Sequence, residues 1–277
     1  INAKKVHRIM KQADLLKEKF RAPVGKNYAR YRIVTPSRPL EVLEMDIKVV
    51  WVAEHRQNAF ILTILDTFTR AVLHWQVGYQ MKEWQVRKAW QSVIEQYLQP
   101  HDLLRKNLHI EVRNDNGPQF VAKKLREFLQ ENHLNQVFTH PYTPQENGHI
   151  ESFHQILSGA LTKEPFWSLI ELENRLHKFY HTYNHVRLHG SIAKLSPMLF
   201  WECWNQDLIE RNEVAKRKIH FKLIIPYQQL SGIKSLKGVL CLSGYADKNN
   251  PGKTEVMGPQ TPNHQPSVQK SPSVVLC

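Results

Sequence analysis

The sequence predicts an α/β domain in which a mixed five-stranded sheet is flanked by helices. Three apolar runs follow one another between residues 43 and 77, and two further runs are each preceded by a segment of helical periodicity. Strands joined by short links pair antiparallel, whereas a helical crossover joins parallel strands. Three antiparallel strands followed by helix, strand, helix and strand therefore indicate a mixed sheet.

The N-terminal region is expected to be a basic helix followed by a linker. Residues 4–16, KKVHRIMKQADLL, place apolar side chains at helical spacing with Lys and Arg on the other side. Residues 20–39 mix Pro, Gly, Arg and Tyr without periodicity, which is typical of a linker. The helix is interpreted either as the end of a helix-turn-helix region or as an isolated amphipathic helix. The chain begins at Ile1 rather than Met, so we expect further sequence upstream.

The first strand carries acids on one face. Apolar side chains in residues 43–49 alternate with Glu44, Asp46 and Lys48. The other four strands are expected at 59–68 (AFILTILDTF), 71–77 (AVLHWQV), 108–112 (LHIEV) and 135–140 (NQVFTH).

Four helices are expected in the same domain. They lie at 82–98, at 121–132, in the segment that opens after Pro144, and at roughly 167–186. In the third helix Glu151 lies beside an apolar stripe formed by Ile150, Phe153, Leu157 and Leu161.

These observations divide the chain into four parts. Residues 1–38 form the basic arm, 39–205 a catalytic-sized domain, 206–231 a C-terminal extension and 232–277 a tail. The tail has five prolines, five glycines and no sustained periodicity, so we expect it to be disordered.

Charge is concentrated at the N-terminus. Residues 1–38 contain 11 Lys or Arg and 2 Asp or Glu, a net charge of +9, whereas residues 39–205 carry −1. A basic arm on a nearly neutral domain favours a nucleic-acid partner, and a solvated tail is the alternative. No apolar run approaches the roughly 20 residues of a membrane span, and the three cysteines are too far apart for a disulfide framework. We therefore expect no membrane partner, and a reducing, cytoplasmic location.

Three acids stand in settings suited to metal binding. Asp46 lies in the first strand, Asp115 in the turn NDNGPQF after the fourth strand, and Glu151 early in a helix after PYTPQENGH. Asp115 and Glu151 are separated by 35 residues, a spacing that alone occurs often by chance. Acids from separate elements can converge on a hard cation such as Mg²⁺, which prefers oxygen ligands.

With these residues the chain resembles the catalytic core shared by retroviral integrases and bacterial insertion-sequence transposases, and is most similar to the latter. The resemblance rests on EMDIK, DNGPQF, PQENGHIESFH and the closing segment YNHVRLHGSIAKLSPMLFW, and it covers about residues 40–205. It implies a ribonuclease-H-like fold in which Asp46, Asp115 and Glu151 are the catalytic, metal-binding DDE residues.

The resemblance also implies an activity and its partners. The expected enzyme is a DDE-type transposase, a polynucleotidyl transferase that cuts and joins DNA by transposition or integration. It would use two Mg²⁺ ions per active site, with Mn²⁺ as a substitute. Its partners would be double-stranded DNA, as element ends and target, and further copies of itself. No small-molecule substrate is expected, and the enzyme would associate with the nucleoid.

Several further residues are candidates for contact with DNA. Amide and imidazole groups around the acids could bind phosphate, and basic residues on the arm could do the same. The candidates are Asn116, Gln145, Asn147, His154, Lys4, Lys5 and Arg8.

The sequence departs from the family at one position and leaves alternatives at others. The family often has Lys or Arg seven residues after the Glu, where this chain has Ser158. Asp66 competes with Asp46 for the first position, although an acid at a strand end commonly caps a turn. A histidine ladder at every fourth residue could bind zinc, although packing or contact with DNA is favoured; its members are His177, His181, His185 and His189. The alternative functions are an idle or domesticated DNA-binding protein, and a nuclease of the same fold that does not join DNA.

Overall fold

The computed structural model describes most of the chain. The described residues are 3–12, 27–30, 34–105, 108–141, 143–161, 165–215, 218–233, 236 and 238–239. The end of the predicted basic helix at 13–16 and nearly all of the predicted disordered tail lie outside them. The described part of that helix is α1 (Ala3–Gln12).

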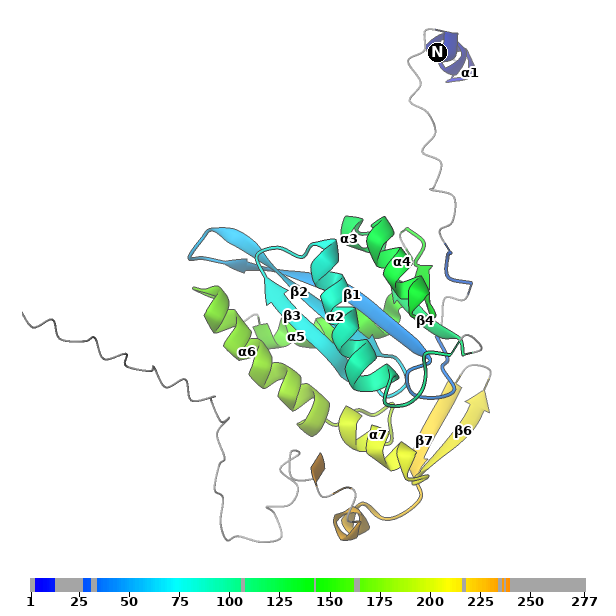
Figure 1. Ribbon diagram of the computed structural model, residues 1–277, viewed down its shortest axis with the longest axis vertical. Coiled ribbons are helices and arrows are strands. Elements are labelled where there is room, and N and C mark those ends of the chain that lie inside the picture. Colours follow the sequence, from blue (N-terminus) through cyan, green and yellow to red (C-terminus); the bar gives the residue numbers. More distant parts are fainter. Residues whose placement is uncertain are drawn as a thin grey trace, which may run out of the picture.

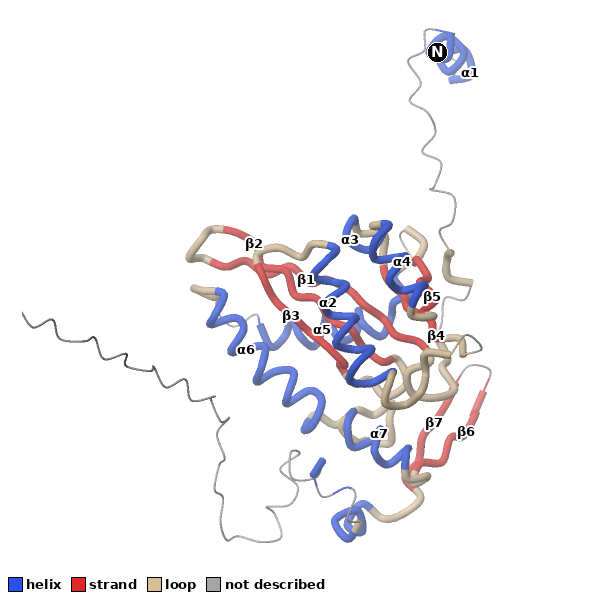
Figure 2. Tube along the Cα trace, viewed as in Figure 1, coloured by secondary structure: helices blue, strands red, loops and turns tan. Residues whose placement is uncertain are grey.

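A five-stranded mixed sheet forms the centre of the domain (Figures 1 and 2). Its order is β3-β2-β1-β4-β5; β1 pairs antiparallel with β2 and parallel with β4, β2 pairs antiparallel with β3, and β4 pairs parallel with β5. The strands are β1 (Val42–Val52), β2 (Gln57–Asp66), β3 (Val72–Gly78), β4 (Ile110–Asn114) and β5 (Leu134–Phe138). The predicted fold class is confirmed: the sheet has five strands and is mixed, and its first three strands are antiparallel.

Helices cover both faces of this sheet and bury two apolar cores. On one face, Met45 and Leu62 pack against Trp90 and Leu125. On that face lie α2 (Glu83–Val93), α3 (Pro118–Val121) and α4 (Lys123–Glu131); α2 crosses in front of the strands in Figure 1. The other face packs on α5 (Gly148–Leu161) and α6 (Leu169–His181). The even-numbered side chains of β1 point to this second face, since Val52 belongs to its core.

Four helices differ in detail from the prediction. Short π-helices at Ile94–Leu98 and Thr182–Val186 continue α2 and α6, and a 3₁₀ turn at Pro144–Asn147 leads directly into α5. The expected helix at 121–132 is interrupted at Ala122, whose ψ of 132° is extended rather than helical. Apolar periodicity predicts a helical segment but does not show such local changes of hydrogen bonding.

The region after the sheet contains elements that the sequence prediction did not place. They are α7 (Pro197–Asn205), an antiparallel pair β6 (Ile209–Ala215) and β7 (Lys218–Leu223), and a 3₁₀ helix at Tyr227–Gly232. Phe221 of β7 packs edge-on against Phe68, which follows β2, with ring centroids 5.2 Å apart. The predicted C-terminal extension therefore shares a core with the predicted catalytic domain.

Candidate active site

The parallel pairing of β1 and β4 brings two of the predicted acids to neighbouring positions. Glu44 of β1 is the register partner of Arg113 of β4. Two residues further along, Asp46 is still within β1, and Asp115 directly follows the end of β4. The two acids therefore follow the last paired positions of neighbouring parallel strands.

A glycine turn holds the second acid. Asp115 Oδ1 accepts a hydrogen bond of 2.9 Å from the Gly117 amide. A Cβ on Gly117 would lie 3.1 Å from that same oxygen, closer than most such contacts. Gly117 therefore leaves room for the carboxylate to turn back onto the backbone.

The third acid lies in the first turn of α5. Ile150, Phe153, Leu157 and Leu161 are the buried residues of this helix, as the sequence predicted. Glu151 is half-buried beside that stripe. The apolar stripe thus fixes the rotation of α5 and keeps Glu151 at the edge of the packed face.

These three acids line one cavity, which we call the acid cavity. Its volume is about 540 Å³, and its other walls come from the segment between β5 and α5 and from the turn after Asp115. The residues lining it are Asp46, Asp115, Asn116, Gly117, Thr139, His140, Pro141, Thr143, Asn147 and Glu151.

A second cavity of about 410 Å³ shares Asp46 and Asp115 with the first. It is lined mainly by apolar side chains of β1, β2 and the segment after β3. They are Ile47, Val49, Phe60, Tyr79 and Met81, joined by the amides of Gln80 and Gln119. Asp46 and Asp115 therefore lie between two cavities.

The electrostatics of the acid cavity suit a divalent cation. Burial raises the pKa of Asp115, and the charge of Asp46 raises it further, whereas the hydrogen bond from the Gly117 amide lowers it. Burial likewise raises the pKa of Glu151, with smaller contributions from the charges of Asp46 and Glu44. A cation held between these oxygens would offset that repulsion, and carboxylates are the ligands that Mg²⁺ prefers. As they stand, no three His, Cys, Asp or Glu side chains in the described part of the chain are close enough to hold a metal ion.

Three of the predicted DNA contacts lie at or beside the acids. Asn116 lines the acid cavity and donates a 2.8 Å hydrogen bond to the Thr139 carbonyl. Asn147 is buried in the same wall. His154 is largely buried, and its Nδ1 lies 3.3 Å from Asp46 Oδ2, so it contacts an acid directly.

The remaining predicted contacts lie away from the acid cavity or outside the described side chains. Gln145 is exposed on the 3₁₀ turn before α5. Lys5 and Arg8 are exposed on α1, and the side chain of Lys4 is outside the described residues. Their role in DNA binding stays a prediction.

Asp66, the competitor of Asp46, holds a turn. It is fully buried at the end of β2. Its carboxylate accepts hydrogen bonds from the amides of Leu40 (3.1 Å) and Thr69 (3.0 Å) and from the Thr69 hydroxyl (2.6 Å). These contacts support the structural role, because they tie Asp66 to the link between β2 and β3.

The histidine ladder is used for packing in the described part of the chain. The His177 ring stacks edge-on against Trp75, and His189 against Tyr183. Only His181 and His185 face one another, with ring centroids 4.9 Å apart. The π-helix ends at Val186, so His189 lies beyond the helix, and no group of three metal-binding side chains is present among the described residues.

The structure adds residues that the sequence reasoning missed. Glu44 is fully buried and accepts hydrogen bonds from α5, and burial raises its pKa to about 7. Arg113 and Glu146, both buried, hold the segment before α5. The available signal was position: Glu44 and Arg113 each lie two residues before a predicted ligand in the sequence.

Comparison with known families agrees with this architecture. Two family models, both described as "Integrase core domain", match residues 36–144 and 132–197. This chain carries an integrase core domain. The matched span includes all three acids and the whole five-stranded sheet.

Individual relatives include proteins of an insertion element and of a virus. The chain is 26% identical over 204 residues to an uncharacterised 39.2 kDa protein of insertion element IS476 from Xanthomonas euvesicatoria, covering 72% of this chain and 55% of that protein. It is 24% identical over 212 residues to the putative integrase ORF3 of Spiroplasma virus SpV1-C74, covering 71% of this chain and 55% of that protein. The chain thus spans about half the length of these relatives.

Solved structures give weaker matches. The catalytic domain of the Mos1 mariner transposase is 12% identical, with a TM-score of 0.45, and the match covers 58% of this chain and 74% of that one.

Among the described residues, no helix is long and apolar enough to cross a membrane.

Proposed function

We propose that this integrase core is the catalytic part of a DDE-type transposase, which cleaves DNA at the ends of a mobile element and joins the freed 3′ ends to target DNA. One observation carries the proposal: Asp46, Asp115 and Glu151 come from three different elements and line a single cavity. The insertion-element and integrase relatives support the class of reaction.

The three acids would hold divalent metal, and their neighbours would hold the acids and the DNA. Two Mg²⁺ ions in this site, or Mn²⁺ in their place, would activate the attacking water or 3′-hydroxyl and stabilise the leaving oxygen. His154 would orient the Asp46 carboxylate through its Nδ1. Asn116 and Asn147 would contact phosphate at the cavity wall, and Gln145 and the basic residues of α1 would contact the DNA backbone.

A charge-removing substitution tests the assignment. Asp115→Asn keeps the size of the side chain but removes a ligand charge, so strand transfer with an element-end oligonucleotide and Mg²⁺ should fall to background. Asp66→Asn is the matched control, since Asp66 is a buried acid that lines neither cavity containing Asp46. Strand transfer that persists in Asp115→Asn, with folding verified by circular dichroism, would overturn the assignment.

The same assay separates the alternative functions by product. A transposase gives joined products, a nuclease of this fold gives cleavage without joining, and an idle DNA-binding protein gives neither. Each outcome is read from one gel with the wild-type chain and Mg²⁺ or Mn²⁺.

We further propose that the protein acts as an oligomer of identical chains on double-stranded DNA, because two element ends must be held together for joining. Large exposed apolar side chains, including Trp51, Trp167 and Ile170, provide surface that another copy could cover. Light scattering with and without paired DNA ends checks this; a monomer under both conditions would contradict it.

A further inference from the structure

The segment that carries Glu151 is held by the two strands that carry the other acids. Glu44 and Arg113 are partners in the β1–β4 register, and each lies two residues before a candidate ligand. In a strand, residues two apart share a face and lie about 6.6 Å apart. Asp46 therefore follows Glu44 on the same face of β1, and Asp115 follows Arg113 directly after the end of β4.

Glu44 of β1 binds the first turn of α5. Its Oε2 accepts the Ile150 amide at 2.7 Å, and its Oε1 lies 3.1 Å from His149 Nδ1. The Ile150 amide is one of the first N–H groups of the helix, which have no partner within the helix. A carboxylate there also complements the positive end of the helix dipole. Ile150 directly precedes Glu151, so this contact fixes the backbone next to the third acid.

Arg113 binds the turn just before that helix. Its Nη1 donates a 3.0 Å hydrogen bond to the Glu146 carbonyl, and its Nε is paired with Glu111. The Glu146 side chain in turn accepts the His140 amide at 2.7 Å and lies 3.0 Å from His140 Nδ1. Residues 140–147 form one side of the acid cavity. These contacts join the two ends of that segment to each other and to β4.

We propose that Glu44 and Arg113 are positioning residues, which set the place of Glu151 relative to Asp46 and Asp115. The inference rests on the proposed function, because it assigns these residues to the assembly of the metal site. Stability alone does not explain charged side chains behind the acids, since well-packed apolar residues often stabilise a buried position equally well. Hydrogen bonds to defined backbone atoms instead fix one separation between strand and helix.

Metal affinity and amide exchange test this together, without relying on activity. Glu44→Ala removes both contacts to α5, so hydrogen–deuterium exchange of the Ile150 amide should accelerate. The Kd for Mn²⁺, measured by electron paramagnetic resonance on the full chain, should rise about tenfold or more, as for other residues that orient ligands. Glu44→Gln can still accept the Ile150 amide and should restore affinity close to that of the wild type. Arg113→Gln should weaken Mn²⁺ binding in the same direction.

Two further variants separate positioning from general destabilisation. Asp66→Asn removes another buried acid of the same sheet and should leave the Kd for Mn²⁺ unchanged. Glu44→Asp keeps the charge but shortens the reach to α5, and it serves if the alanine variant does not fold; its Kd should also rise. Wild-type affinity in folded Glu44→Asp, or equal weakening in Asp66→Asn, would overturn the proposal.

Failure of the proposed function gives a different pattern. If the wild type does not bind Mn²⁺, or if Asp115→Asn binds as tightly as the wild type, the metal assignment itself fails. If Asp115→Asn loses Mn²⁺ while Glu44→Asp retains it, the acids are ligands and only the positioning role is wrong.

Discussion

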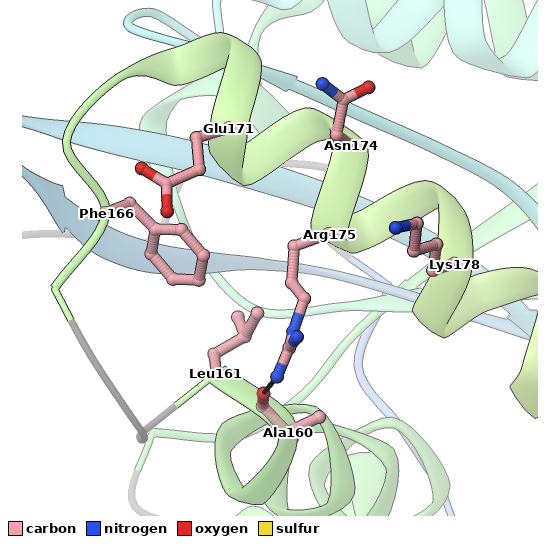
Figure 3. Close-up of a pocket in the computed structure, with 7 residues that line it drawn as sticks. All are labelled: Ala160, Leu161, Phe166, Glu171, Asn174, Arg175 and Lys178. Carbon is pink, nitrogen blue, oxygen red and sulfur yellow. Dashed lines mark hydrogen bonds between the residues drawn. The ribbon is translucent and has the colours of Figure 1, made fainter.

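The two ends of α5 are held in different ways. At its start, the Glu44 carboxylate from the sheet accepts the Ile150 amide at 2.7 Å in a buried setting. At its end, Arg175 of α6 donates to the Ala160 carbonyl at 3.4 Å in an exposed setting, beside a cavity of about 440 Å³ (Figure 3). Both charges complement the helix dipole. Of these two contacts, only the one from Glu44 is short and shielded from water, so only it holds the helix at a fixed position on the sheet. It lies at the end of α5 that carries Glu151.

The largest expected effect is at the start of the helix. Glu151→Gln should reduce strand transfer to background, because it removes one of three charges from the proposed metal site. The same change should leave the thermal unfolding temperature equal or higher, since burial and the charges of Asp46 and Glu44 raise the pKa of Glu151 and so disfavour its ionised form. A strand-transfer assay and a melting curve check both results. A large drop in melting temperature would instead indicate that Glu151 stabilises the fold.

Glu44 should make the stability of the protein depend on pH. Its pKa rises from 4.5 to about 7, chiefly because of burial, so the folded state binds an extra proton between these values. The resulting stabilisation is full below pH 4.5 and is lost as the pH rises through 7; it amounts to roughly 3 kcal/mol at most. Urea denaturation of the wild type from pH 5 to 8 should show this decline.

Glu44→Gln provides the comparison for that decline. The neutral amide cannot titrate, so its free energy of unfolding should vary less over the same pH range. Parallel curves for the two proteins would show that Glu44 titrates normally and that the decline has another source.

The difference between local spacing and long-range contacts explains what the sequence could predict. Apolar periodicity predicted the five strands and the buried stripe of α5, because both depend on local spacing. Motif context placed Asp46, Asp115 and Glu151, and the structure brings these acids to one cavity. The bond between Glu44 and Ile150 joins residues 106 positions apart, which no local pattern shows.

Other features escaped prediction for a similar reason. β6 is mostly exposed and has little apolar alternation, whereas Ile219, Phe221 and Leu223 of β7 do alternate with exposed polar residues, a strand signal that the sequence prediction did not use. Phe221 packs against Phe68, which joins the pair to the rest of the fold. The π-helices depend on backbone hydrogen bonding rather than on side-chain type. Contacts with DNA remain predictions, because they involve a partner that the fold alone does not define.

A smaller effect is expected from restoring a cation in the middle of α5. Ser158 lies two turns after Glu151 and donates its hydroxyl to the His154 carbonyl at 2.6 Å. Ser158→Lys should tighten DNA binding at low salt and steepen the salt dependence, by about 0.9 in the logarithmic slope if one phosphate is contacted. Fluorescence anisotropy with a labelled duplex between about 50 and about 200 mM salt measures the slope. An unchanged slope would show that this face of α5 does not meet the DNA backbone.

The smallest effect is expected at the end of α5. Arg175→Ala removes the donor to the Ala160 carbonyl, but that bond is long and exposed, so the free energy of unfolding should fall by no more than about 1 kcal/mol. The Kd for Mn²⁺ and the rate of strand transfer should not change, because the residues around Arg175 line a cavity separate from the acids. Urea denaturation and Mn²⁺ titration measure the two quantities on one preparation. If Arg175→Ala weakened Mn²⁺ binding as strongly as Glu44→Ala, the position of Glu151 would depend on the whole helix as a rigid rod, and the distinction between its two ends would be lost.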